Sequence, residues 1–195
     1  KYSNHYKKLK EKHSELCRIN AINRQLAINE DANYLRSLGD VFITEPKIAG
    51  KLMKRAKETT VNSKGKINKK KRFGKSIKNR CPSGFQATVE EKFKTTGGTY
   101  IEVPNDYRAS QYDHTADDYI KKKLSDRMFH LSDGTLVQRD WYSSFLLYCY
   151  NYRTKNIDRD RCISEFEKCY SKEEALIERI KTNRIKLLNS GIKIA

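Results

Sequence analysis

Residues 47–80 restrict the fold of this chain more than any other segment, because Lys and Arg dominate them and Glu58 is their only acid. Like charges at this density repel one another, so the segment becomes ordered only when phosphates or similar anions neutralise it. The core must therefore come from the residues on either side. The alternative is a solvated loop that binds nothing. The densest basic run is Lys69, Lys70, Lys71 and Arg72.

Two β-favouring stretches and one helix flank this segment. Residues 41–45 read VFITE and predict a short strand. A helix that repeats apolar residues every four positions begins at Pro82, and residues 99–103 predict the next strand. Strand, helix and strand in this order make a βαβ unit, so we expect the two strands to be parallel neighbours.

The first part of the chain predicts two helices. From Tyr6 to Leu26 apolar residues recur at steps of three and four, which is typical of an amphipathic helix, and His13 falls on the apolar stripe. We expect His13 to be packed there rather than to bind a ligand. A second, short helix should end at Gly39.

The last part predicts a hairpin between irregular and helical segments. Residues 105–123 are polar and show no core pattern. Residues 127–138 contain an Asp-Gly pair between two β-favouring runs, which predicts a β-hairpin because this pair accepts the positive φ of a tight turn. Residues 141–152 predict the most apolar helix. A final helix with a capping box should begin at Ser171 and end near Gly191.

The composition favours an anionic partner and excludes several classes of protein. Among 195 residues, Lys and Arg outnumber Asp and Glu by 41 to 24, which gives a net charge of +17, and twelve Tyr accompany them. This balance favours nucleic acid over a membrane surface. No apolar run approaches the roughly 20 residues of a membrane span. Five Cys without a C-x-x-C pair indicate a reducing compartment and argue against a disulfide framework and a cysteine zinc site.

Two acids stand at the ends of predicted core elements. Glu45 closes the strand at residues 41–45, and Asp140 precedes the apolar helix. Carboxylates that converge on one point are costly unless a cation lies between them, and two Mg²⁺ ions held in this way can catalyse phosphodiester hydrolysis. The alternative is that both acids only cap secondary structure.

Several motifs, in their order and spacing, resemble a known family. They read VFITEP, KSIKNRCPSGFQATVEEKFKTTGGTYIEV, RASQYDH and KKKLSDRMFHLSDGTLVQRD, and the apolar helix follows. Residues 6–151 resemble the C-terminal half of TnpB, the RNA-guided nucleases of insertion sequences, which are similar to type V CRISPR effectors. The resemblance implies a RuvC-like nuclease on an RNase H-like fold with three Mg²⁺-binding carboxylates. Glu45 matches the second acid, and Asp140 matches the third.

The chain departs from the family pattern at three places. The family usually reads Asp-Arg-Asp where this chain reads Gln138, Arg139 and Asp140. The first acid should precede Lys1, so we expect a fragment or the C-terminal piece of a split protein. Many members also bind zinc through two Cys pairs, and the matching positions here are Tyr112, Thr115, His130 and Asp133. We therefore expect no zinc. A substitute site made of His114, His130 and Asp133 is the alternative.

The resemblance implies an α/β fold with an RNase H-like (RuvC) core, incomplete at its N-terminus, flanking helices and an inserted β-hairpin subdomain. It divides the chain into basic helices at 1–38, a core at 39–104, an inserted target-binding hairpin region at 105–138, a core helix at 139–165 and a C-terminal helix at 166–195. The catalytic and metal-binding residues would be Glu45 and Asp140, with Mg²⁺ or Mn²⁺ as the cofactor.

Nucleic acid would bind through cations of the basic segment and of the insertion. The partners implied are guide RNA, target DNA and the upstream part of the protein or a split partner, with no membrane, in a bacterial-type cytoplasm near the nucleoid. Two alternatives are an RNA-guided DNA-binding protein without cleavage activity and a basic structural component of a ribonucleoprotein. The expected contacts are Lys54, Arg55, Lys69, Lys70, Lys71, Arg72, Lys75, Lys121, Lys122 and Arg127. Tyr100, Tyr107 and Tyr112 are candidates for stacking on bases.

Overall fold

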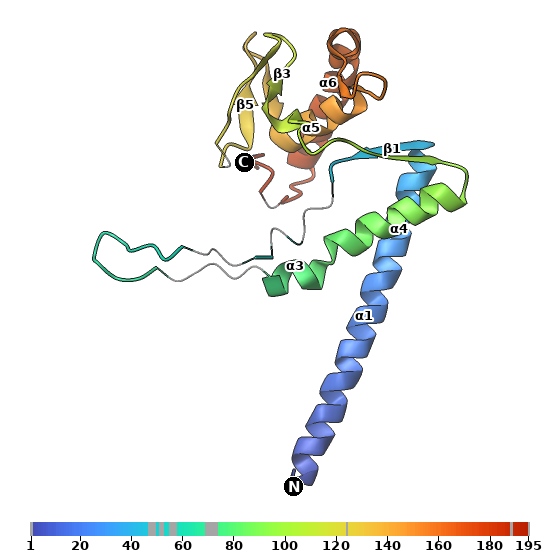
Figure 1. Cartoon of the computed structure of the whole chain (residues 1–195), viewed down its shortest axis with the longest axis vertical. Helices are drawn as coiled ribbons and strands as arrows, with labels where there is room; N and C mark the ends of the chain where they lie inside the picture. The colour runs from blue at the N-terminus through green and yellow to red at the C-terminus, as the bar shows by residue number, and fades with distance from the viewer. Residues whose placement is uncertain are drawn as a thin grey trace. The chain divides into compact units, whose positions relative to one another are not determined.

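The computed structural model describes residues 2–46, 50, 53–54, 58–68, 74–123, 125–187 and 189–194. It is a mixed α/β structure of helices and two-stranded sheets (Figure 1). The chain divides into two compact units, the first made of Lys1–Phe42 and Lys47–Ile101, the second of Ile43–Pro46 and Glu102–Ala195. None of the helices within the described ranges is both long and apolar enough to cross a membrane.

The first unit is built from two long helices. Helix α1 (Asn4–Leu38) is capped by Ser3, whose side chain accepts a hydrogen bond from the Tyr6 N–H. Helix α4 (Pro82–Thr95) packs on the C-terminal part of α1 (Figure 1). Their shared core is small: Ala32 meets Val89 and Phe93, all at most 1% exposed. The apolar side chains of this unit therefore protect only one end of α1 from water.

Helix α1 corrects two expectations. The chain forms one continuous helix where two were predicted, because no Gly or Pro interrupts residues 4–38. The helix does stop at Gly39, as predicted. The apolar stripe between Tyr6 and Leu26 is exposed rather than buried, and His13 is exposed with it. The periodicity therefore predicts the helix correctly, but it does not mark the face that this unit buries.

The predicted βαβ pairing is confirmed. Strands β1 (Val41–Thr44) and β2 (Thr99–Glu102) form a two-stranded sheet, with α4 and the shorter α3 (Gly74–Arg80) between them in sequence. The Thr99 N–H donates to the Asp40 carbonyl (2.7 Å), and the Val103 N–H donates to the Thr44 carbonyl (2.9 Å). From the first bond to the second, the residue number rises by the same amount on both strands, so the strands are parallel.

A short turn lies within the described part of the basic segment. Val61 and Ile67 form an antiparallel bridge, and the Asn62 side-chain oxygen accepts hydrogen bonds from the backbone N–H groups of Lys64 (2.9 Å) and Lys66 (3.0 Å). Asn62 thus supplies the local acceptor that closes the turn. The two lysine side chains of this turn are exposed.

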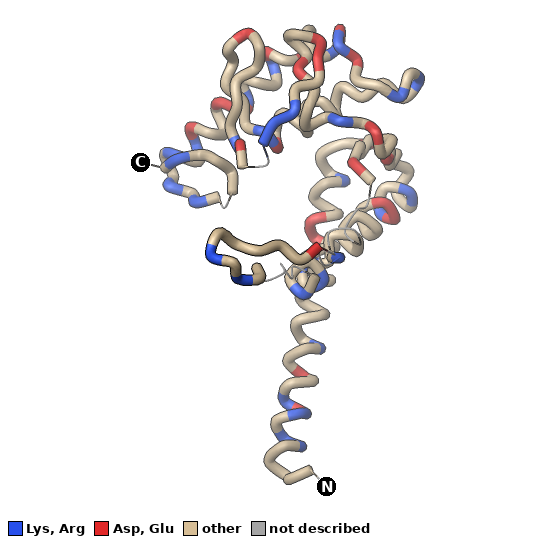
Figure 2. Tube along the Cα trace, turned by 60° about the vertical axis from the view of Figure 1, so that its left-hand side comes forward, with Lys and Arg blue, Asp and Glu red and all other residues tan. Residues whose placement is uncertain are grey.

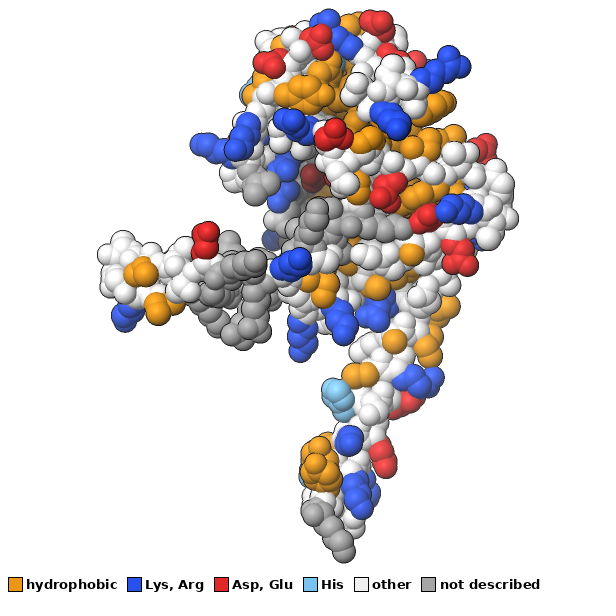
Figure 3. Space-filling view, in the orientation of Figure 1, with side chains coloured by type: hydrophobic (Ala, Val, Ile, Leu, Met, Phe, Trp, Pro, Cys, Tyr) orange, Lys and Arg blue, Asp and Glu red, His pale blue; other side chains and the backbone are white. Residues whose placement is uncertain are grey.

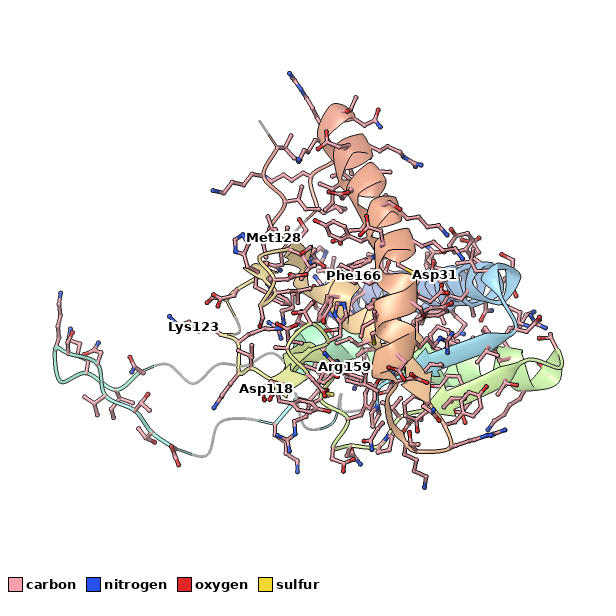
Figure 4. All side chains as sticks on the ribbon, turned by 90° about the horizontal axis from the view of Figure 1, so that it is seen from above. Asp31, Asp118, Lys123, Met128, Arg159 and Phe166 are labelled. Carbon is pink, nitrogen blue, oxygen red and sulfur yellow. The ribbon has the colours of Figure 1, made fainter. Side chains whose placement is uncertain are left out.

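Within its described residues, the second unit contains three β-hairpins, two α-helices and a short 3-10 helix. The hairpins are β3 (Tyr112–Asp113) with β4 (Asp118–Tyr119), β5 (Met128–His130) with β6 (Leu136–Gln138), and β7 (Tyr150–Asn151) with β8 (Asn156–Ile157), all antiparallel. The helices are α5 (Arg139–Tyr148) and α6 (Arg159–Thr182). Their core contains Tyr142, Phe145, Leu146, Cys149, Cys162 and Phe166, and Figure 4 shows Phe166 on α6 and Met128 on β5.

Of three predictions for this unit, the structure confirms one and corrects two. The hairpin at residues 127–138 is confirmed, with Phe129 opposite Val137. Residues 105–123 do contribute to the core, because Ala109 (in the 3-10 helix η1, Ala109–Gln111) and Tyr112 are buried. The last helix starts at Arg159 rather than Ser171, because the Asp158 side chain caps it by accepting the Arg161 N–H (3.0 Å). It therefore runs across the boundary expected at 165–166.

Gly98 lies where the first unit has no room for a side chain. A Cβ at this position would lie 2.9 Å from Phe93 Cδ1, 3.1 Å from the Asp40 carbonyl oxygen and 3.2 Å from Arg36 Nε. The Arg36 guanidinium is fixed here, because it donates to Thr96 Oγ1 (2.8 Å) and pairs with Asp40 (2.7 Å).

We predict that Gly98→Ala destabilises the first unit by about 1–3 kcal/mol, because fixed backbone and ring atoms would have to move. Gly39→Ala is the matched control, since no atom lies within 4 Å of its added Cβ, and it should change stability by less than about 0.5 kcal/mol. Urea unfolding followed by circular dichroism measures both. Equal stabilities of the two variants would contradict the prediction.

Candidate functional site

The two expected catalytic acids both belong to the second unit and are both exposed. Glu45 directly follows β1. Asp140 lies in the first turn of α5, and its side chain is 67% exposed. A strand end and a helix start hold the two backbones, so the carboxylates stand on ordered elements and remain open to solvent.

The start of α5 is fixed from two sides. Strand β6 leads straight into the helix, and the Gln138 side-chain oxygen caps it by accepting the Trp141 N–H (2.7 Å). The Arg139 N–H donates to the Arg127 carbonyl (2.9 Å). The Arg127 guanidinium also lies 3.9 Å from the Asp140 carboxylate. The structure thus brings together two of the residues singled out from the sequence, one cation and one anion.

This pair is compatible with two roles for Asp140. An exposed ion pair at 3.9 Å contributes at most about 1 kcal/mol, and an acid in the first helical turn gains a similar amount from the helix dipole. Both effects stabilise the helix start without any ligand. A carboxylate that is still 67% exposed, however, keeps oxygen atoms for a metal or a water.

Among the residues that the structure describes, no three His, Cys, Asp or Glu side chains are grouped so that they could hold a metal ion. Asp113, Asp117 and Asp118 are three of the acids within the predicted insertion at residues 105–138. Each is already engaged: Asp117 accepts the Tyr112 hydroxyl (2.6 Å), and Asp118 accepts the adjacent Tyr119 N–H (2.7 Å).

Asp113 is a buried acid whose two carboxylate oxygens are both hydrogen-bonded. It is 1% exposed, and its Oδ1 accepts hydrogen bonds from the Thr115 N–H (3.0 Å) and hydroxyl (2.7 Å). Its Oδ2 accepts the Ser132 N–H (2.9 Å) and hydroxyl (2.8 Å). One carboxylate therefore ties the β3–β4 hairpin to the turn of β5–β6. Burial would raise the pKa of Asp113, but these bonds from Thr115 and Ser132 outweigh it and lower the pKa.

The positions that match zinc ligands, or could replace them, have other roles. Tyr112 is buried in the core. The His114 ring nitrogen lies 2.8 Å from the Tyr142 hydroxyl, and burial lowers the pKa of His114, so the ring is neutral and already bonded. Asp133 Oδ1 accepts the Thr135 N–H (2.9 Å), while His130 is exposed. The Asp113 carboxylate, rather than any group at those positions, links the two turns.

The three tyrosines proposed for base stacking all make contacts within the protein. The Tyr107 hydroxyl donates to the Leu146 carbonyl (2.6 Å), and Tyr112 is 4% exposed. Tyr100 stacks on Phe42 with ring centroids 5.8 Å apart. Each of the three rings is thus packed within the protein, whereas an unpaired base requires an open ring face.

The expected phosphate contacts differ in accessibility. Lys54 and Lys75, in the first unit, and Lys121, in the second, are exposed. The Lys122 ammonium is buried 3.5 Å from the Phe129 ring centroid, and burial lowers the pKa of Lys122 to about 8. This position suits a cation–π contact better than a phosphate contact. Arg55, Lys69, Lys70, Lys71 and Arg72 lie outside the described residues.

Glu173 is a second buried acid, in addition to Asp113, that was not predicted from the sequence. Glu173 is 4% exposed, its Oε1 accepts the Gln138 N–H (3.2 Å), and burial raises the pKa of Glu173 to about 7. Its position was recognisable in principle, because Cys162, Phe166, Glu173 and Ile180 lie on one stripe of α6 and are all buried. The stripe is hidden when α6 is expected to begin only at Ser171.

We predict that Asp113→Asn lowers the free energy of unfolding by about 2–4 kcal/mol. The substitution removes the negative charge and places an NH₂ group, which cannot accept a hydrogen bond, opposite N–H and hydroxyl donors. Since the folded-state pKa is lowered, the contribution of Asp113 is present above about pH 4 and is lost as the pH falls through the folded pKa. Denaturant unfolding at several pH values measures this. Asp118→Asn, at an exposed acid of the same hairpin, is the control and should change little.

A scan against protein-family models and a search of curated proteins found no match to this chain.

Proposed function

We propose that this chain is the C-terminal catalytic part of an RNA-guided DNA endonuclease of the TnpB type. The observation that carries the proposal is the placement of Glu45 and Asp140, since both stand exposed at the ends of ordered elements within one unit. Acids that only cap structure explain each residue alone. They do not explain why both occupy the positions at which the motif order places the second and third nuclease carboxylates.

The secondary structure agrees with this proposal at the level of its elements. An RNase H-like core contains parallel strands joined by helical crossovers, and β1 and β2 are parallel with α4 between them in sequence. The remaining strands and the first acid would come from an upstream segment or a split partner. With that third acid, the site would have the ligand set that two metal ions require.

The carboxylate donors fit a hard divalent cation. Mg²⁺ and Mn²⁺ prefer oxygen ligands, and Glu45 and Asp140 are the residues of this chain that would hold them. The bound ion would polarise the phosphodiester and activate a water. Arg127, whose guanidinium lies 3.9 Å from Asp140, would balance the charge of the nearest phosphate and orient it.

The charge of the chain suits its proposed partners, guide RNA and target DNA. Lys and Arg lie along both units, with Asp and Glu interspersed among them (Figure 2). Such a distribution binds phosphates without reading bases, so sequence choice would rest on pairing between guide and target. The competing functions are a guided DNA-binding protein without cleavage activity and a structural component of a ribonucleoprotein. Cleavage that depends on Glu45 and Asp140 would distinguish the nuclease from both.

We predict that Glu45→Gln and Asp140→Asn, each made in the complete protein, lower the cleavage rate at least roughly 100-fold and leave guide and target binding nearly unchanged, because only the metal ligands are altered. Single-turnover cleavage of guide-matched DNA measures the rate, and gel shift measures binding. A rate within a few-fold of the parent would refute the assignment of that residue.

Matched controls exist for both acids. Glu102→Gln changes an exposed acid at the end of β2, and Asp160→Asn changes an acid in the first turn of α6. Both controls should cut at the parental rate. If they lose as much activity as Glu45→Gln and Asp140→Asn, the effect is a general loss of helix or strand stability and not loss of metal ligands.

We further predict that neutralising Lys69, Lys70, Lys71 and Arg72 together makes the dependence of log affinity on log salt shallower, by somewhat less than one for each phosphate that these side chains no longer bind. Affinity titrations at a series of salt concentrations measure the slope. Replacing four exposed lysines of α1, namely Lys7, Lys8, Lys10 and Lys12, provides a control of equal charge. An unchanged slope after the first set of substitutions would show that this run is a solvated loop.

A further inference from the structure

The β7–β8 hairpin carries exposed aromatic and basic side chains that the proposed catalytic site does not use. Tyr152 is 66% exposed at its tip, and Tyr148, at the end of α5, is 45% exposed. Arg153 and Lys155 are exposed on the same loop. In Figure 3, Lys and Arg side chains project from the second unit beside hydrophobic ones.

The loop holds these side chains outward on a tightly bonded backbone. The Asn151 side-chain oxygen accepts the N–H groups of Arg153 (3.0 Å) and Thr154 (3.3 Å), and the Asn151 carbonyl accepts the Lys155 N–H (2.8 Å). Lys155 adopts a positive φ of 58° to close the turn. The loop is thus ordered by its own hydrogen bonds, so the exposure of Tyr152 is built into its geometry.

A pocket of about 330 Å³ lies at the base of the hairpin. Its lining includes Tyr150, Tyr152, Arg153 and Arg161. The guanidinium of Arg161 lies over the Tyr148 ring, 4.2 Å from its centroid. Asp158 also lines the pocket, and both of its carboxylate oxygens are bonded, because they accept the Arg161 N–H (3.0 Å) and the Asn151 side-chain amide (3.3 Å). The groups that remain open to a ligand include the exposed ring of Tyr152 and the exposed guanidinium of Arg153.

We propose that this surface, Tyr148, Tyr152, Arg153, Lys155 and Arg161, binds an unpaired strand of nucleic acid. Stacking on Tyr152 requires a base with an exposed face, and bases inside a duplex do not have one. The pocket, at about 330 Å³, has room for one planar base. Arg153 and Lys155 supply the charge that the adjoining phosphates require. The inference rests on the proposed function, in which a displaced DNA strand or an unpaired part of the guide would be the natural occupant.

The test uses the whole chain and fluorescein-labelled oligonucleotides of about 15 nucleotides, namely oligothymidine, oligouridine and a DNA duplex of the same length. In fluorescence anisotropy, Tyr152→Leu should weaken single-strand binding at least about five-fold, whereas Tyr152→Phe should stay within about two-fold of the parent. Duplex binding should be unchanged in both variants. Tighter binding of oligouridine than oligothymidine would assign the surface to RNA, and the reverse order would assign it to DNA.

The charged residues have their own matched control. Arg153→Ala with Lys155→Ala should reduce the slope of log affinity against log salt by roughly one, whereas Lys172→Ala with Lys186→Ala, which removes the same charge from exposed positions, should not weaken binding specifically. A photo-crosslink from a 4-thiouridine oligonucleotide to Tyr152, mapped by mass spectrometry in the unaltered chain, tests the site without any substitution.

The outcomes separate this inference from the proposed function, because no guide, metal or cleavage enters the measurement. Single-strand binding that depends on Tyr152 would stand even if Glu45 and Asp140 proved unnecessary for cutting. The inference is overturned if Tyr152→Leu binds single strands like the parent, or if it weakens duplex and single-strand binding equally. It is also overturned if a phosphorylated peptide binds as tightly as the oligonucleotide and depends on the same two cations.

Discussion

The carboxylate of Asp113 is the group on which the second unit depends. Four hydrogen bonds from Thr115 and Ser132 compensate its burial and fix the turns of two hairpins relative to each other. The second of these hairpins ends in β6, which runs directly into α5 and so sets the direction of Asp140. A buried charge held in this way gives geometric precision, since any displacement of the turns would leave the carboxylate without donors. The exposed acid of the proposed site is thus positioned by a buried one.

Elements with a strong local signal were predictable from the sequence. The strand expected at residues 41–45 and the Asp-Gly hairpin each combine a β-favouring run with a stop or turn residue, and the helix that begins at Pro82 combines a period of four with a start residue. The structure contains all three, with the strand at Val41–Thr44. The core role of residues 105–123 was not predictable, because Asp113 and His114 look like surface residues and become buried only through partners far away in sequence. Likewise the stripe on α1 is a correct helical period on a face that no described residue of its own unit buries.

The candidate site shows the same division. Glu45 and Asp140 could be chosen from motif order, and the structure adds that both are exposed and that Arg127 lies beside Asp140. The choice of Lys122 shows the limit of reasoning from charge alone, because its ammonium is packed against Phe129. The β7–β8 hairpin was not predictable because its short Asn-Tyr-Arg-Thr-Lys stretch has no periodic pattern that would indicate strands. Only the folded loop reveals that its tyrosine and its cations face solvent together.

Helix α1 is packed against its unit near its C-terminal end and is exposed to solvent along the rest of its length. Ile28 and Ala32 are buried against their unit, whereas every described residue before Ile28 is exposed. The exposed turns are held by their own backbone bonds and by local pairs such as Glu15 with Arg18 (2.7 Å), which water screens and which therefore stabilise the helix only weakly. They can open without disturbing the core, while the turn at Ala32 opens only when the unit does. Amide protons should therefore exchange with solvent quickly near Tyr6 and slowly near Ala32, with a graded protection in between.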